Sequence, residues 1–256
     1  MIIDQKAERE IRKRQLYIAQ AIFDLCAKNN ISCFLVGGSL LGAVKDQDIL
    51  PGDKDIDIGM LREEYEKFIS LIDELPDDLY VLEARKDTEY NWLFAKVCQK
   101  GTKLQPKDSP LFGPVTGIFV DVIPYDFVNL DERKRKADYK RAKLLKWFML
   151  LKEKPSRMNP KLFILSVIGC FWSRNILIQY FTKSKNKTNM VGNVVGGTTK
   201  DWFMLDEIQD IQTVSLGGHV FMAPASQRYL DINYPGWEMM EMVRNEFDNY
   251  EIDWNE

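Results

Sequence analysis

The sequence predicts an α+β protein with one core domain and a basic helical insertion. The chain has 256 residues, of which 45% are hydrophobic and 29% charged, and a chain of this kind can bury the core of one sizeable domain. Short apolar runs typical of strands lie between stretches with helical periodicity. Positive charge is concentrated in the middle of the chain, and we interpret this stretch as the insertion.

The first predicted helix covers residues 4–29, because apolar side chains recur along one face. These side chains are Ile11, Ile18, Ile22 and Leu25. Residues 31–36 form a short apolar run that ends at two glycines, so we predict a buried strand there. Further strands are predicted over residues 55–58, 79–85, 92–99 and 117–122, and further helices over residues 40–45, with Ser39 as the N-cap, and 62–75.

The basic stretch covers residues 131–187, with 16 Lys and Arg residues against four Asp and Glu. Because the whole chain has a net charge of −3, the remaining parts are acidic. We divide the chain into a catalytic core at residues 1–130, a basic helical segment at 131–187, and a C-terminal part at 188–256 that packs on the core.

An apolar run at residues 162–172 lies inside the basic segment and is too short to span a bilayer. Two interpretations of residues 155–182 are open: a core or interdomain helix, or a surface helix on an anionic membrane. The sequence has no RRM, KH or helix-turn-helix signature, so we expect no nucleic-acid partner. The charged N-terminus has no apolar signal-peptide region, so we expect a cytoplasmic protein, peripheral on the inner face of the membrane if this segment binds it.

Histidine and cysteine usage excludes several kinds of site. The one histidine, His219, cannot supply a multi-histidine zinc site, and we interpret it as a structural residue at a turn or strand edge. The four cysteines, at positions 26, 33, 98 and 170, include no C-x-x-C pair, which indicates reduced, buried thiols. Any metal chemistry therefore depends on carboxylates, which favour Mg²⁺ or Mn²⁺.

A glycine-rich segment follows the first predicted strand. Gly37 and Gly38 let the backbone approach a ligand closely, and Ser39 begins a helix whose N–H groups suit a phosphate. Lys45 adds positive charge further along that helix. Such a segment alone is common in turns, so its weight comes from the carboxylates that follow it.

Asp55 and Asp57 are two residues apart on a predicted strand, so both point to the same face. Two carboxylates placed in this way can hold two divalent ions for phosphoryl transfer. A third carboxylate is expected from another strand, and Asp121 is the acidic residue in the apolar run 117–122. A buried Asp in such a strand should have a cationic partner.

The segment GGSLLGAVKDQDILPGDKDIDIGM, at residues 37–60, resembles the signature of the LicD family. This family includes the fukutin-type transferases and is similar to nucleotidyltransferases related to DNA polymerase β. Later stretches fit the same family in order: Phe94-Ala95-Lys96-Val97, GIFVDVIP at residues 117–124, and a weaker group that includes Tyr229 and Tyr234-Pro235-Gly236. The resemblance implies a nucleotidyltransferase-like fold, with a mixed sheet flanked by helices.

The resemblance also implies roles for individual residues. The residues implied to contact donor phosphates are Gly37, Gly38, Ser39, Lys45 and Lys96. Asp55, Asp57 and Asp121 are the implied catalytic and Mg²⁺- or Mn²⁺-binding residues, Asp53 is a further candidate ligand, and Asp121 would accept the proton. Lys54 replaces an acidic residue of the family pattern, and on a strand it would face away from Asp55 and Asp57.

The implied reaction is Mg²⁺-dependent transfer of phosphocholine, or a related phospho-alcohol, from a CDP-linked donor to a sugar hydroxyl. The acceptor would be a cell-surface glycopolymer such as teichoic acid, lipopolysaccharide or capsule, or a lipid-linked glycan. Two alternatives are open. One is a nucleotidyltransferase that acts on a small acceptor and releases pyrophosphate, and the other is a non-catalytic scaffold that binds a membrane or a glycopolymer.

Overall fold

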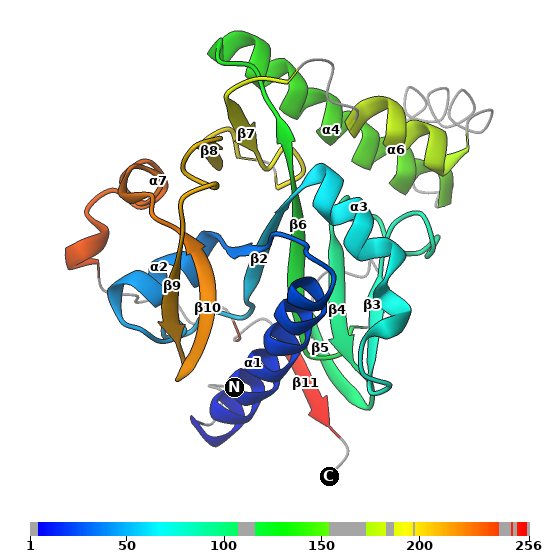
Figure 1. Ribbon diagram of the computed structural model, residues 1–256. Helices are drawn as coiled ribbons and strands as arrows, with labels where there is room; N and C mark the ends of the chain where they lie inside the picture. Colours follow the sequence, from blue (N-terminus) through cyan, green and yellow to red (C-terminus); the bar gives the residue numbers. More distant parts are fainter. Residues whose placement is uncertain are drawn as a thin grey trace.

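A mixed β-sheet forms the framework of the protein, as expected for the α+β class (Figure 1). The structure is a computed structural model that describes residues 5–106, 116–153, 173–182, 187–196, 198–240, 247 and 250–254. The strand order is β1-β2-β6-β4-β3, with β7 on β6 and β8 on β7; β2 and β6 are parallel, and the other pairs are antiparallel. These strands are β1 (Phe34–Leu35), β2 (Asp57–Leu61), β3 (Leu79–Leu82), β4 (Ala95–Gln99), β6 (Phe119–Phe127), β7 (Met190–Gly192) and β8 (Trp202–Met204).

Two smaller antiparallel sheets accompany the main one. The first pairs β9 (Ile211–Leu216) with β10 (His219–Pro224), and the second pairs β5 (Thr102–Pro106) with β11 (Tyr250–Trp254). β11 lies in the acidic stretch at the C-terminal end of the chain. Its partner β5 lies almost 150 residues earlier, and no local pattern indicates such a pairing.

The helices lie around the main sheet, with α1 and α3 in front of it in the view of Figure 1. The α-helices are α1 (Gln5–Lys28), α2 (Gly37–Lys45), α3 (Arg62–Ser70), α4 (Glu132–Glu153), α6 (Arg174–Thr182) and α7 (Gln227–Asn233), and short 3-10 helices are η1 (Ile72–Glu74) and η3 (Trp237–Met239). The predicted first helix is confirmed, because all four of its predicted apolar side chains are buried.

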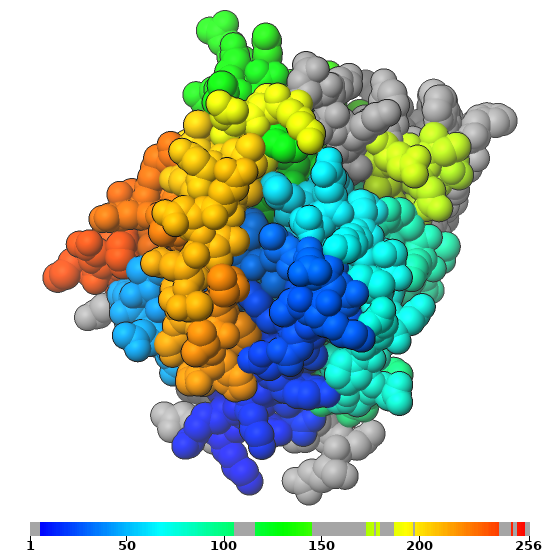
Figure 2. All heavy atoms as spheres, viewed as in Figure 1, coloured from blue at the N-terminus to red at the C-terminus, as the bar shows by residue number. Residues whose placement is uncertain are grey.

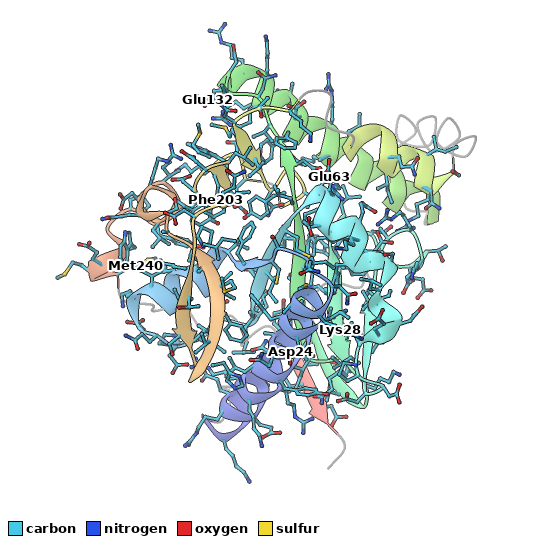
Figure 3. The ribbon with its side chains drawn as sticks, in the orientation of Figure 1. Asp24, Lys28, Glu63, Glu132, Phe203 and Met240 are labelled. Carbon is cyan, nitrogen blue, oxygen red and sulfur yellow. The ribbon has the colours of Figure 1, made fainter. Side chains whose placement is uncertain are left out.

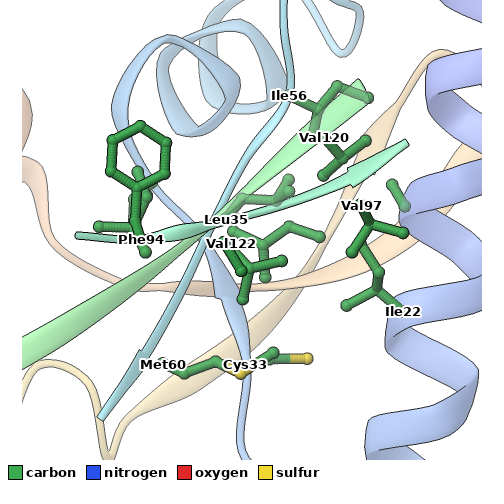
Figure 4. Close-up of a cluster of buried hydrophobic side chains, with 14 of the residues drawn as sticks. Ile22, Cys33, Leu35, Ile56, Met60, Phe94, Val97, Val120 and Val122 are labelled. Carbon is green, nitrogen blue, oxygen red and sulfur yellow. The ribbon is translucent and has the colours of Figure 1, made fainter. Parts of the chain in front are cut away.

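The hydrophobic core between α1 and the sheet fixes which way the strand side chains point. Ile22 of α1 lies in one buried cluster with Val97, Val120 and Val122 of β4 and β6 (Figure 4). Since successive strand side chains alternate between faces, Asp121 points to the opposite face from these valines. The carboxylates of interest therefore lie on the side of the sheet away from α1.

Aromatic rings pack on that second face of the sheet. Phe34, Tyr125 and Phe203 lie within 6.0 Å of one another, centroid to centroid. Phe203, labelled in Figure 3, stacks on the ring of Tyr229 from α7 at 4.1 Å. The aromatic cluster thus attaches the chain after residue 188 to the face that carries Asp121.

Several element boundaries differ from the prediction. The strand predicted over residues 31–36 is reduced to β1, and β2 begins at Asp57, so Asp55 lies before the strand. The reason is that β1 pairs only with residues 58 and 59, and the chain turns into α2 directly after Val36. The predicted helix over residues 62–75 ends at Ser70 and is followed by η1.

The basic segment includes α4 and α6, which contact each other, while the apolar run at residues 162–172 lies outside the described residues. In the part of α4 whose side chains are described, most basic residues are exposed, and the start of this helix lies at the top of Figure 2 in green. These residues are Arg133, Lys134, Lys136, Lys140, Arg141 and Lys143. Among the described helices, none is long and apolar enough to cross a membrane.

Candidate active site

Three carboxylates meet where β2 lies beside β6. In the parallel register Asp57 is directly opposite Asp121, and Asp55 precedes β2 by two residues. One oxygen of each residue lies within 4.8 Å of the others. The structure therefore brings together the three residues that the sequence predicted, although only Asp57 and Asp121 are on strands.

Lys96 is the cationic partner expected for the buried Asp121. The antiparallel register of β4 and β6 places the two residues opposite each other, and Lys96 Nζ lies 2.5 Å from Asp121 Oδ1. The ammonium also lies 3.4 Å from the centroid of the Phe119 ring. Lys96 is thus in the site, where it neutralises a carboxylate in this structure, and its predicted contact with a donor phosphate stays a prediction.

Lys54 also lies in the site, contrary to the expectation that it would face away. Its Nζ is 3.2 Å from Oδ2 and 3.4 Å from Oδ1 of Asp55. The expectation assumed a continuous strand through residues 54–57, whereas the strand begins at Asp57. The irregular backbone before β2 leaves the Lys54 side chain on the same side as the carboxylates.

The crowded negative charge changes the proton affinity of the cluster. Burial, together with the charges of Asp55, Asp121 and Asp53, raises the pKa of Asp57 well above its usual value. Burial raises the pKa of Asp121 to about 6, although the ammonium of Lys96 opposes the shift. Burial and mutual repulsion therefore both disfavour the ionised form of these carboxylates, and a bound cation would relieve both effects.

The two glycines of the segment allow two carboxylates to lie against the backbone. Gly37 has a φ of +59°, and a Cβ there would be 2.7 Å from Asp57 Oδ2. A Cβ on Gly38 would collide with Asp53 Oδ2. Asp53 therefore borders the site, although it is not part of the group whose oxygens lie within 4.8 Å.

Ser39 and Lys45 are not placed as predicted. Helix α2 begins at Gly37 with Val36 as its N-cap, so Ser39 is not the cap. Its hydroxyl instead accepts a hydrogen bond of 2.9 Å from the Asp57 backbone N–H, which links the helix start to the strand start. Lys45 is in the last turn of α2 and pairs with Asp46, about 12 Å along the helix from Gly37, so the structure does not bring it to the carboxylates.

A hydrogen-bonded group beyond the glycine segment was not identified from the sequence. Asp201 Oδ1 accepts from the hydroxyls of Tyr125 at 2.6 Å and Tyr229 at 3.0 Å, and Asp201 Oδ2 accepts from Asn193 at 2.8 Å. The Tyr229 hydroxyl accepts in turn from the Gly37 N–H. No spacing pattern indicates this group, because its members come from β6, α7 and the segment between β7 and β8.

His219 and the cysteines have the structural character expected of them. His219 begins β10, where its Nδ1 lies 3.3 Å from Gln20 Oε1 and its ring stacks on Phe221. Cys26, Cys33 and Cys98 are buried free thiols, and Cys170 lies outside the described residues.

Parts of this chain match known proteins, and the family match contains the three carboxylates. Residues 30–146 match the family described as "LicD/FKTN/FKRP, nucleotidyltransferase domain". Over 123 residues the chain is 30% identical to the lipopolysaccharide cholinephosphotransferase LicD of Haemophilus influenzae. This match covers 46% of this chain and 45% of that protein. Over 62 residues the chain is 42% identical to an uncharacterized protein of Rickettsia typhi, and this match covers 23% of this chain and 20% of that protein.

A similar short match, 44% identical over 55 residues, relates the chain to an uncharacterized protein of Rickettsia prowazekii, and covers 20% of this chain and 21% of that protein. The chain thus spans less than half the length of each of these relatives. Fold and site define the class: an α+β domain with a carboxylate cluster that could hold a metal ion. Over residues 30–146 the chain is similar to the LicD family.

Proposed function

We propose that the protein is a LicD-type transferase. It transfers phosphocholine, or a related phospho-alcohol, from a CDP-linked donor to a sugar hydroxyl of a glycopolymer or lipid-linked glycan. The observation that carries this proposal is the convergence of Asp55, Asp57 and Asp121 inside the segment that matches the family. The Haemophilus relative, whose name gives a lipopolysaccharide acceptor and a phosphocholine group, supports the substrate class.

The carboxylate cluster fits a hard divalent cation, and we propose Mg²⁺ or Mn²⁺ as the cofactor. Asp55, Asp57 and Asp121 supply oxygen ligands close enough to share one ion. Burial, and after it the neighbouring carboxylates, raise the pKa of Asp57, and a bound cation would favour its ionised form. When bound, the cation would stabilise the negative charge that develops on the transferred phosphoryl group.

The donor diphosphate would lie at the N-terminus of α2, beside Gly38 and Ser39. A helix N-terminus attracts anions because its N–H groups and its dipole point there, and this one adjoins the carboxylates through the contact of Gly37 with Asp57. The family description, which names a nucleotidyltransferase domain, supports this proposal.

In the proposed reaction Asp121 accepts the proton of the acceptor hydroxyl. Its pKa of about 6 suits a general base near neutral pH, and Lys96 favours its ionised form. As the proton moves to Asp121, the hydroxyl oxygen forms a bond to the distal phosphorus of the donor. The bond from that phosphorus to the bridging oxygen breaks in line, and CMP leaves with the electron pair.

A thermal-shift screen with CDP-choline, CDP-ribitol and CDP-glycerol, each with Mg²⁺, tests the donor class, since a ligand that binds only the folded state raises the melting temperature. Product analysis then tests the reaction. Release of CMP is expected, whereas release of pyrophosphate would indicate nucleotidyl transfer. Absence of any nucleotide binding would favour a non-catalytic scaffold.

The variant Asp57→Asn tests the metal assignment. It should fold and lose transfer, and retained turnover in that variant would contradict the metal assignment.

We further propose that the exposed basic residues of α4 contact an anionic membrane near the acceptor. Six exposed Lys and Arg side chains lie within residues 133–143, and each basic residue near such a surface adds about 1 kcal/mol of attraction. Co-sedimentation with phosphatidylglycerol vesicles but not with phosphatidylcholine vesicles is expected. Equal binding to both would contradict the proposal.

A further inference from the structure

Lys54 occupies a defined position on the edge of the carboxylate cluster. Its ammonium contacts both oxygens of Asp55, at 3.2 and 3.4 Å. Its backbone is also fixed, because the side chain of Gln15 in α1, which is fully buried, donates a hydrogen bond to the Lys54 carbonyl. Lys54 is therefore built into the site by a core residue and does not merely reach it from the surface.

The two lysines of the site limit the number of carboxylate oxygens that remain for metal ions. The Lys96 ammonium contacts Oδ1 of Asp121, and the Lys54 ammonium contacts the carboxylate of Asp55. Oxygens in the shell of one Mg²⁺ ion are at most about 4.2 Å apart, since each bond is about 2.1 Å long. The three carboxylates offer oxygens within 4.8 Å of one another, which is close to the size of a single shell.

The charges at the site point in the same direction. The ammonium of Lys96 pairs with Asp121 and that of Lys54 with Asp55, so two of the three clustered carboxylates already have a cationic partner. A second divalent ion would have to bind close to the Lys54 ammonium, where like charges repel.

We propose that Lys54 is the second cation of this site, so that the cluster binds one divalent ion and the Lys54 ammonium stands where a two-metal site would hold another. The inference rests on the proposed function, because it assumes that the carboxylates bind a metal. It changes the expectation of two ions that the carboxylate spacing suggests. It also assigns a role to a residue that departs from the acidic family pattern.

Counting bound Mn²⁺ tests the proposal without an activity assay. Free Mn²⁺ is measured by electron paramagnetic resonance during titration of the full chain, with and without CDP-choline. The wild type should bind one ion in both conditions. Lys54→Met, or Lys54→Gln if the first variant folds poorly, should bind its first ion at least tenfold more tightly and take up a second ion.

Lys28→Met is the matched control, because it removes one positive charge from an exposed ion pair with Glu74; it should bind Mn²⁺ like the wild type. Two ions in the wild type, or a Lys54→Met variant with unchanged stoichiometry and affinity, would overturn the proposal for Lys54. A wild type that binds no Mn²⁺ in either condition would instead contradict the proposed metal-dependent function, and with it this inference.

Discussion

The hydroxyl of Tyr229 accepts a hydrogen bond of 3.2 Å from the backbone N–H of Gly37, a residue 192 positions earlier in the chain. The same hydroxyl donates to Asp201, whose other partners include Tyr125 of β6. Gly37 also holds the left-handed backbone conformation that lets Asp57 approach. The C-terminal part of the chain therefore helps to shape the start of α2 beside the carboxylates.

Tyr229→Phe should weaken Mn²⁺ binding while the fold is kept. The ring still stacks on Phe203, but Gly37 loses its acceptor, so the backbone beside Asp57 is held less firmly. We expect a loss of about 1 kcal/mol in the free energy of unfolding, together with an Mn²⁺ affinity reduced severalfold, as measured by titration calorimetry. Tyr125→Phe removes a comparable bond to Asp201 without touching Gly37. Equal Mn²⁺ affinities in the two variants would refute a positioning role for Tyr229.

Gly37→Ala should impair the site more than its backbone strain alone explains. The added Cβ would meet Asp57 Oδ2 at 2.7 Å, and the φ of +59° is unfavourable for alanine. Backbone strain of this kind costs about 1–3 kcal/mol. Gly101→Ala is the control, because Gly101 has a φ of +72° but no atom within 4 Å of the added Cβ. Urea unfolding should show losses for both variants, whereas Mn²⁺ affinity should fall only for Gly37→Ala.

The sequence allowed the carboxylate cluster to be predicted because its chemistry is local. Asp55 and Asp57 are neighbours, and an Asp in an apolar strand requires a partner, which the structure confirms as Lys96. The first helix was also predictable, since its hydrophobic pattern is regular, whereas the mixed sheet was implied by the family resemblance. Strand boundaries were less accurate, because they depend on which neighbouring strand is available for pairing.

The surroundings of the cluster could not be predicted, because they depend on contacts between distant segments. Asp201 acquires its meaning only when β6 and α7 bring Tyr125 and Tyr229 to it. Lys54 was expected on the wrong side because the start of β2 is determined by the short β1. Ser39 has the residue type of a helix cap, yet it binds the Asp57 N–H, which local patterns do not reveal.

Lys96→Met should destabilise the protein strongly at neutral pH. It would leave the buried Asp121 without the ammonium that favours its ionised form, and breaking a buried ion pair costs about 3–5 kcal/mol. The double variant Lys96→Met with Asp121→Asn removes both charges and should recover much of this loss in denaturant unfolding. If the double variant is as unstable as the sum of the two single variants, the ion pair is not the cause.

The metal-free protein should lose stability as the pH rises from about 4 to above 6. In the unfolded chain Asp residues ionise near pH 3.9, whereas burial and neighbouring carboxylates raise the folded-state pKa of Asp57, and burial raises that of Asp121 to about 6. Below pH 4 both states hold the protons. Above pH 4 the unfolded state ionises first, so a rising pH favours unfolding. For Asp121 the full loss in the free energy of unfolding, on the order of 3 kcal/mol, is reached above pH 6.

Urea unfolding in EDTA at pH 5 and pH 7, with and without excess Mg²⁺, measures this effect. Other carboxylates titrate over the same range, so the informative quantity is the difference between the wild type and Asp57→Asn. Because Asn removes one of the crowded charges, the variant should be more stable than the wild type at pH 7 in EDTA, and the gain should shrink at pH 5. Mg²⁺ should stabilise only the wild type. A variant that is less stable than the wild type at pH 7 without metal would show that the carboxylates do not repel one another as their positions require.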